Sequence, residues 1–176
     1  FVDTVVQVSP PGSGRFVLAI ESQERKDPDK RYSWAWYLSF LMGKYECPAL
    51  LLVLSSNPAT AKWAAEPFDL GAVGHAAVTV RPLVLGPGNT PVVADPEEAE
   101  QDLPTATLSA LLHRDDAAVD AILEPLARAL ATMADRKAAN HYMLMIEAGL
   151  GDHGAPASVG SPSPRPRRGP QRGPQP

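Results

Sequence analysis

The chain has 176 residues, of which 44% are hydrophobic and 20% are charged, and its formal net charge is −4. This length and hydrophobic content suit one globular domain with a core of its own. No apolar run approaches the ~20 residues that a membrane-spanning helix needs. No basic-then-apolar leader opens the chain, and its single cysteine cannot form an internal disulfide. We therefore expect a cytoplasmic protein that does not enter a membrane.

The net charge is the sum of two unlike parts. Residues 154–176 hold four arginines, seven of the 19 prolines and no Asp or Glu, so residues 1–153 carry a net charge of −8. We predict an α/β domain over residues 1–153 and a disordered Pro/Arg/Gly-rich tail over residues 154–176. The tail either contacts nucleic acid or an acidic partner, or results from frame-shifted reading of GC-rich DNA. Because the chain begins at Phe1, inside an apolar run, we expect the domain to be N-terminally truncated.

The first elements are predicted to be a β-hairpin followed by a helix. Residues 2–8 and 16–20 are apolar runs rich in β-branched residues, and the turn-forming sequence Pro-Pro-Gly-Ser-Gly lies between them. Apolar residues then recur at helical spacing over residues 31–45. Trp36 and Phe40 lie on a second face of that helix, so we expect both faces to be covered.

Strands and helices alternate over the next part of the chain. The continuous apolar run 50–54 predicts a strand that is buried on both faces of a sheet. Asn57-Pro58 predicts the start of a short helix over residues 59–66. Residues 78–85 are predicted to form another strand, and residues 91–93 a short edge strand.

The pattern becomes helical after Asp95. We predict helices over residues 120–133, where Pro125 should introduce a kink, and over residues 138–148. Their Leu/Ile/Met stripe either docks a second subunit, giving a homo-oligomer, or packs on the sheet, which we prefer. The order of elements predicts an α/β fold with a mixed central sheet that starts with a β-hairpin, is flanked by helices and ends in a helical C-terminal part.

Two carboxylates are candidates for a metal site. If the hairpin is centred on Gly12, Asp3 lies opposite Glu21, and directly opposed residues have Cβ atoms ~4.5–5.5 Å apart. Carboxylates that close repel each other unless a cation lies between them, and divalent ions such as Mg²⁺ prefer such oxygen ligands. The alternative is that Asp3 frays at the chain end and that Glu21 lies on a solvated face.

The sequence around these carboxylates is similar to a known nuclease superfamily. Val2-Asp3-Thr4-Val5 followed by Leu18-Ala19-Ile20-Glu21-Ser22-Gln23 resembles the PD-(D/E)xK nucleases, and roughly residues 2–54 take part. The closer resemblance is to the recombination-promoting nuclease and putative transposase group. In that group a Glu-x-Gln triplet precedes a basic residue and an aromatic helix, here Arg31 and Tyr37.

The resemblance implies a restriction-endonuclease-like core that hydrolyses DNA phosphodiester bonds and is associated with mobile elements. It implies that Asp3, Glu21 and the backbone carbonyl of Ser22 bind Mg²⁺ or Mn²⁺, which activates water. Gln23 stands where the superfamily usually has Lys, and Lys26 is the candidate to supply that charge. The superfamily core opens with a helix before the first strand, which this chain lacks, so we expect the polypeptide alone to be poorly stable or inactive.

Two further features bear on a DNA substrate. Lys26, Lys30, Arg31 and Lys44 are predicted to form a basic patch around the site, and we assign Lys30 and Arg31 to substrate binding. The aromatic residues of the helix over 31–45 could stack on bases, although their helical spacing favours core packing. The alternative function is a non-catalytic or degenerate interaction or structural domain on the same fold.

Overall fold

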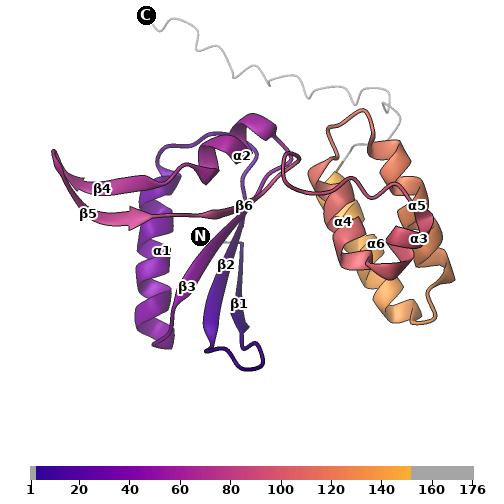
Figure 1. Cartoon of the computed structure of the whole chain (residues 1–176), viewed down its shortest axis with the longest axis horizontal. Helices are drawn as coiled ribbons and strands as arrows, with labels where there is room; N and C mark the ends of the chain where they lie inside the picture. Colours follow the sequence, from indigo (N-terminus) through magenta and orange to yellow (C-terminus); the bar gives the residue numbers. More distant parts are fainter. Residues whose placement is uncertain (1–2, 152–176) are drawn as a thin grey trace, which may run out of the picture.

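The structure, a computed structural model, describes residues 3–151. Its central element is a four-stranded mixed sheet in the order β1-β2-β3-β6 (Figure 1). The strands are β1 (Thr4–Val8), β2 (Phe16–Ser22), β3 (Ala49–Leu54) and β6 (Leu83–Leu85). β1 is antiparallel to β2, whereas β2, β3 and β6 are parallel to one another. The predicted α/β class with a mixed sheet that starts from a hairpin is therefore confirmed.

The hairpin has the predicted register. Thr4 lies opposite Ile20 and Val8 lies opposite Phe16, which is the pairing expected of a hairpin centred on Gly12. Gly12 itself has a φ of 72°, a backbone conformation that glycine adopts without steric cost. The turn residues thus set which side chains share a face of the two strands.

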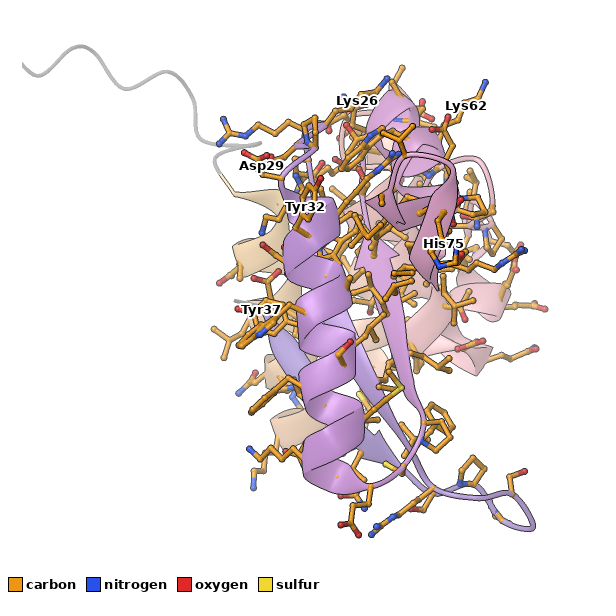
Figure 2. The ribbon with its side chains drawn as sticks, turned by 90° about the vertical axis from the view of Figure 1, so that its left-hand side faces the viewer. Lys26, Asp29, Tyr32, Tyr37, Lys62 and His75 are labelled. Carbon is orange, nitrogen blue, oxygen red and sulfur yellow. The ribbon has the colours of Figure 1, made fainter. Side chains whose placement is uncertain are left out.

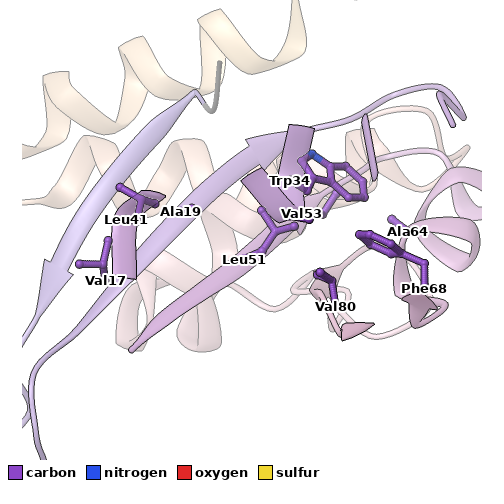
Figure 3. Packing of buried hydrophobic residues seen from close by; sticks show 10 residues of the cluster. Val17, Ala19, Trp34, Leu41, Leu51, Val53, Ala64, Phe68 and Val80 are labelled. Carbon is purple, nitrogen blue, oxygen red and sulfur yellow. The ribbon is translucent and has the colours of Figure 1, made fainter. Parts of the chain in front are cut away.

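Helix α1 (Lys30–Tyr45) covers one face of the sheet, and α2 (Pro58–Ala65) follows β3. Parallel neighbours such as β2 and β3 need a crossover connection, which α1 provides. The buried side chains of this first core come from α1, α2 and the strands (Figure 3); they are Val17, Ala19, Trp34, Ala35, Leu41, Leu51, Val53, Ala64, Phe68 and Val80. The opposite face of the sheet is also apolar, but none of its side chains is fully buried; they include Val6, Leu18, Ile20, Leu50, Leu52 and Leu54. The expectation that the strand over residues 50–54 is buried on both faces is therefore wrong.

Residues 66–93 differ from the prediction. β4 (Phe68–Ala72) and β5 (His75–Val80) form a separate antiparallel hairpin, and the strand predicted over residues 78–85 is two strands. The break falls at Pro82, which has no N–H to donate to a ladder. Residues 91–93 are not a strand, because the amide of Val93 donates to the side chain of Ser109 (3.0 Å) instead of to a neighbouring strand.

The rest of the described chain is helical. Helices α3 (Pro96–Gln101), α4 (Leu103–Leu112), α5 (Val119–Thr132) and α6 (Arg136–Leu150) lie beside the sheet in Figure 1. Their buried residues form a second hydrophobic cluster together with Val93, so the preferred interpretation, in which the stripe packs on the sheet, is wrong. The cluster consists of Val93, Ala99, Ala106, Ala110, Ile122, Leu126, Ala129 and Leu130. Among residues 3–151, no helix has the length and apolar character needed to cross a membrane. The predicted tail over 154–176 lies outside the described residues.

Candidate metal site at the end of strand β2

Buried polar side chains gather where β2 and β3 end. Glu21 and Gln23 lie at the end of β2, and Ser55, Ser56 and Thr60 follow β3. The two strands are parallel, so their carboxyl ends share one edge of the sheet. Ligands of open α/β sheets bind at that edge, and it is therefore the first place to look for a functional site.

The structure brings Asp3 and Glu21 together. Asp3 precedes Thr4, whose partner is Ile20, so the alternation of side chains places Asp3 and Glu21 on the same face of the hairpin. The Oδ2 atom of Asp3 also accepts a hydrogen bond from the backbone N–H of Ser22 (2.7 Å). The carboxylate of Asp3 is thereby fixed beside the end of β2.

Glu21 is the buried member of this pair and has a counterion. Only 2% of its surface is exposed, and its Oε1 atom accepts a hydrogen bond from the ammonium of Lys30, the first residue of α1. That hydrogen bond is the main reason why the pKa of Lys30 is raised, although partial burial of the ammonium opposes the rise. The negative charges of Glu21, Asp3 and Asp27 raise the pKa of Lys30 further. Asp3, Glu21 and Lys30 therefore form one electrostatic unit.

Two other predicted site residues lie outside this unit. The guanidinium of Arg31 lies over the rings of Trp63 and Phe68, 5.3 Å from each ring centroid, and pairs with Glu66 at 3.5 Å. Lys26 is exposed and forms no ion pair within residues 3–151 (Figure 2).

Gln23, Ser22 and Lys44 are also placed by the structure. The side-chain amide of Gln23 is buried and donates to the backbone carbonyl of Arg25. Ser22 is exposed at the last position of β2. Lys44 lies near the far end of α1, about 21 Å from Lys30 along the helix axis. The predicted basic patch of four residues is therefore not one patch.

The donor atoms at this site suit a hard divalent cation. The Oε2 atom of Glu21 is buried and has no hydrogen-bond partner among the described residues, and Asp3 brings a second carboxylate. One or two carboxylates plus several waters is the usual protein site for Mg²⁺. Within residues 3–151 no three His, Cys, Asp or Glu side chains group as metal ligands. These residues thus fit a cation held by the carboxylates of Asp3 and Glu21 and by water. Such a cation would compete with the ammonium of Lys30 for the carboxylate of Glu21.

A second polar cluster, which sequence reasoning missed, joins the sheet to the helices. The Oγ atom of Ser56 lies 2.7 Å from carboxylate oxygens of both Glu24 and Asp115, and Arg114 pairs with Glu24 at 3.0 Å. These residues come from three distant segments, so no local pattern could have predicted that they meet. A pocket of about 250 Å³ lies next to them, and Ser56, His113, Asp115 and Asp116 contribute to its lining.

His113 is buried and lines the same pocket. Its Nε2 atom lies 3.1 Å from the backbone carbonyl of Thr90. Because a carbonyl can only accept, Nε2 carries a hydrogen. The Nδ1 atom is buried without a hydrogen-bond partner and lies 3.6 Å from Oδ2 of Asp116. The ring therefore holds the connection before α3 against the loop after α4.

Comparisons of the chain with protein-family models, with curated proteins and with solved structures find no match. The resemblance to PD-(D/E)xK nucleases therefore stays a prediction from the residues around Asp3 and Glu21.

Proposed function

We propose that the protein is a divalent-metal-dependent nuclease that hydrolyses DNA phosphodiester bonds on a restriction-endonuclease-like core. One observation carries the proposal: the buried carboxylate of Glu21, with one oxygen unpartnered, lies beside Asp3 at the carboxyl end of β2. Burying a carboxylate is costly even when it is paired. Clusters of titratable groups with mutual electrostatic effects occur preferentially at functional sites. An association with mobile elements is part of the same proposal and follows from the resemblance alone.

In this proposal each member of the unit has its own role. Asp3 and Glu21 would hold Mg²⁺ or Mn²⁺, which supplies an activated water and offsets charge on the phosphoryl oxygens when bound. Lys30 orients the carboxylate of Glu21 through the hydrogen bond to Oε1. The ordinary lysine pKa of 10.5 already keeps the ammonium of Lys30 charged at neutral pH, and the hydrogen bond to Glu21 raises that pKa further. This charge could offset the charge of a phosphate. Lys30 would thus provide the positive charge that Gln23 cannot.

Cleavage of plasmid DNA tests the proposal. Under this proposal the chain nicks or linearises the plasmid with Mg²⁺ or Mn²⁺ and not with EDTA, and such cutting would contradict the expectation that the polypeptide alone is inactive. The Glu21→Gln variant keeps the side-chain shape but loses the charge, and we expect its cleavage rate to fall by about 100-fold, as when one charged transition-state contact is lost. Glu97→Gln, in an exposed position of α3, is the matched control and should cut like wild type. Equal cleavage by Glu21→Gln and wild type would rule out this site.

A non-catalytic domain on the same fold is the second candidate. It is favoured by the counterion that Glu21 already has and by the hydrogen bond that holds the amide of Gln23 on Arg25. In that case the Glu21–Lys30 pair is structural, and the double variant Glu21→Gln, Lys30→Met should fold as stably as wild type. Absence of cleavage by wild type, together with that result in urea denaturation, would establish the second candidate over the first.

A further inference from the structure

The solvent-facing side of α1 carries large aromatic side chains. Tyr32, Trp36 and Phe40, here called the aromatic ladder, are 68%, 61% and 49% exposed. They follow one another every four residues, and Lys44 continues the series. Figure 2 views the molecule from the side of α1, with Tyr32 near the start of the helix. The expectation that the aromatic residues of this helix pack in the core holds for Trp34 and is wrong for Trp36 and Phe40.

Two of the three rings of the ladder are stacked on each other. Trp36 and Phe40 are stacked, with ring centroids 5.6 Å apart and an interplanar angle of 13°. The ammonium of Lys44 lies 5.8 Å from the centroid of Phe40. Within residues 3–151 no ring contact joins Tyr32 to Trp36, and the two positions are separated by about 6 Å of helical rise. The exposed ring of Trp36 is therefore not stacked on Tyr32 and is available to a planar group of a partner.

The charge of α1 indicates the kind of partner. None of its 16 residues is acidic, although residues 1–153 carry a net charge of −8. Lys44 forms no ion pair among the described residues, and its ammonium lies near the rings of Phe40 and Tyr45. An apolar protein surface would satisfy the rings but would bury this ammonium without a counter-charge. A partner with planar groups and negative charge satisfies both.

We propose that the aromatic ladder is a stacking platform for the bases of a single-stranded DNA segment, with Lys44 facing its phosphates. Bases in a duplex are stacked on each other, so only an unpaired or frayed strand offers free base faces to protein rings. The inference rests on the proposed function, because α1 starts at Lys30 beside Asp3 and Glu21. A strand that follows the ladder toward the start of α1 therefore approaches Lys30 and the exposed Asp3.

Fluorescence anisotropy of a labelled single strand of about 12 nucleotides, in EDTA, tests the platform. We expect wild type to bind it more tightly than the duplex of the same sequence. Trp36→Ala should weaken the affinity by about tenfold, since one stacked base contributes binding of that order. Trp36→Phe keeps a ring and should retain most of the affinity. Leu144→Ala on α6 removes another large side chain, 64% exposed, and should change nothing.

Three results would overturn the inference. They are equal affinity of Trp36→Ala and wild type, equal affinity for duplex and single strand, and full competition by inorganic polyphosphate, which carries charge but no bases. Dissociation of a wild-type dimer by Trp36→Ala, without DNA binding, would make the ladder a protein interface instead. The ladder and the proposed function can fail separately, because EDTA prevents cleavage during the binding assay. If binding depends on the ladder but no DNA is cut when Mg²⁺ is present, only the proposed function is contradicted. Cutting that does not depend on Trp36 contradicts only the ladder.

Discussion

The carboxylate of Glu21 and the ammonium of Lys30 are coupled at the base of α1. Glu21 is almost fully buried, so removing its counterion would leave a charge in the interior. Loss of one partner of a buried pair typically costs 3–5 kcal/mol, and Lys30 is still partly exposed, so we expect Lys30→Met to cost about 2–3 kcal/mol of unfolding free energy. The site and the fold thus depend on the same pair.

The pH dependence of stability follows from the same coupling. Glu21 raises the pKa of Lys30 above its ordinary value of 10.5. Because the folded pKa lies above the unfolded one, the contribution of Lys30 is fully present below pH 10.5 and is lost as the pH rises through the folded pKa. We therefore expect the unfolding free energy of wild type to fall more steeply above pH 10.5 than that of Lys30→Met, measured by urea denaturation.

Lys62 provides the control for this measurement. It is an exposed lysine of α2 that forms no ion pair within the described part of the chain (Figure 2). Lys62→Met should keep the wild-type dependence on alkaline pH. Parallel pH profiles for wild type and Lys30→Met would show that the pair does not contribute in this way.

At the residue scale, the sequence predicts the site only in part. The meeting of Asp3 and Glu21 follows from the turn residues around Gly12 and from side-chain alternation, both of which are local. The pairing of Lys30 with Glu21 requires the position of the first turn of α1 over the sheet, which no local pattern specifies. The assignment of Arg31 to substrate binding rests on the local sequence alone. The contact of its guanidinium with Trp63 depends on how α2 packs, which no local pattern specifies.

At the scale of elements, the hairpin β4–β5 depends on one glycine. A Cβ atom on Gly71 would lie 2.2 Å from the carbonyl oxygen of His75 and 2.7 Å from the amide nitrogen of Ala77. Both neighbours are backbone atoms, and the register shifts between Leu70 and Gly71. The close approach of the two strands is therefore possible only without a side chain at this position.

We expect Gly71→Ala to separate the outer part of the hairpin, because one strand must move away from the new methyl group. Hydrogen exchange should show faster exchange for amides of β4 and β5 near the turn, with little change at their buried ends, Phe68 and Val80. Gly88→Ala is the matched control, since a Cβ there meets nothing within 4 Å. Unchanged protection of the hairpin in Gly71→Ala would contradict this account.

Elements with strong patterns are the ones that the sequence predicts. The continuous apolar run of β3 and the helical spacing of α1 are local patterns that predict these two elements, although only one face of β3 is buried. β4 was missed because its sequence, Phe-Asp-Leu-Gly-Ala, has no β-branched residue and contains a glycine. The segment 91–93 has strand-like residues but serves another purpose, because Val93 packs among the helices and bonds to Ser109.

At the scale of the whole molecule, two hydrophobic clusters are joined through polar contacts. One cluster lies between α1 and the sheet and the other lies among α3–α6. Arg114 connects them: it donates to the carbonyl of Gly149 at the end of α6 (2.7 Å) and pairs with Glu24 after β2 (3.0 Å). Ser56 and Asp115 add a second connection at 2.7 Å. The coupling of the two clusters therefore depends on a few directional contacts rather than on a shared apolar interface.

Calorimetry of an Arg114 variant tests this coupling. With Arg114 intact, the two clusters should unfold together, with equal calorimetric and van't Hoff enthalpies. Arg114→Met keeps the length of the side chain but loses the polar contacts with Glu24 and Gly149, so we expect two transitions and a calorimetric enthalpy above the van't Hoff value. Arg128→Met is the control, because Arg128 pairs with Glu124 on the exposed surface of α5 and such pairs contribute only about 0.3–0.5 kcal/mol. A single transition in Arg114→Met, at the wild-type midpoint, would show that other contacts couple the sheet to the helices.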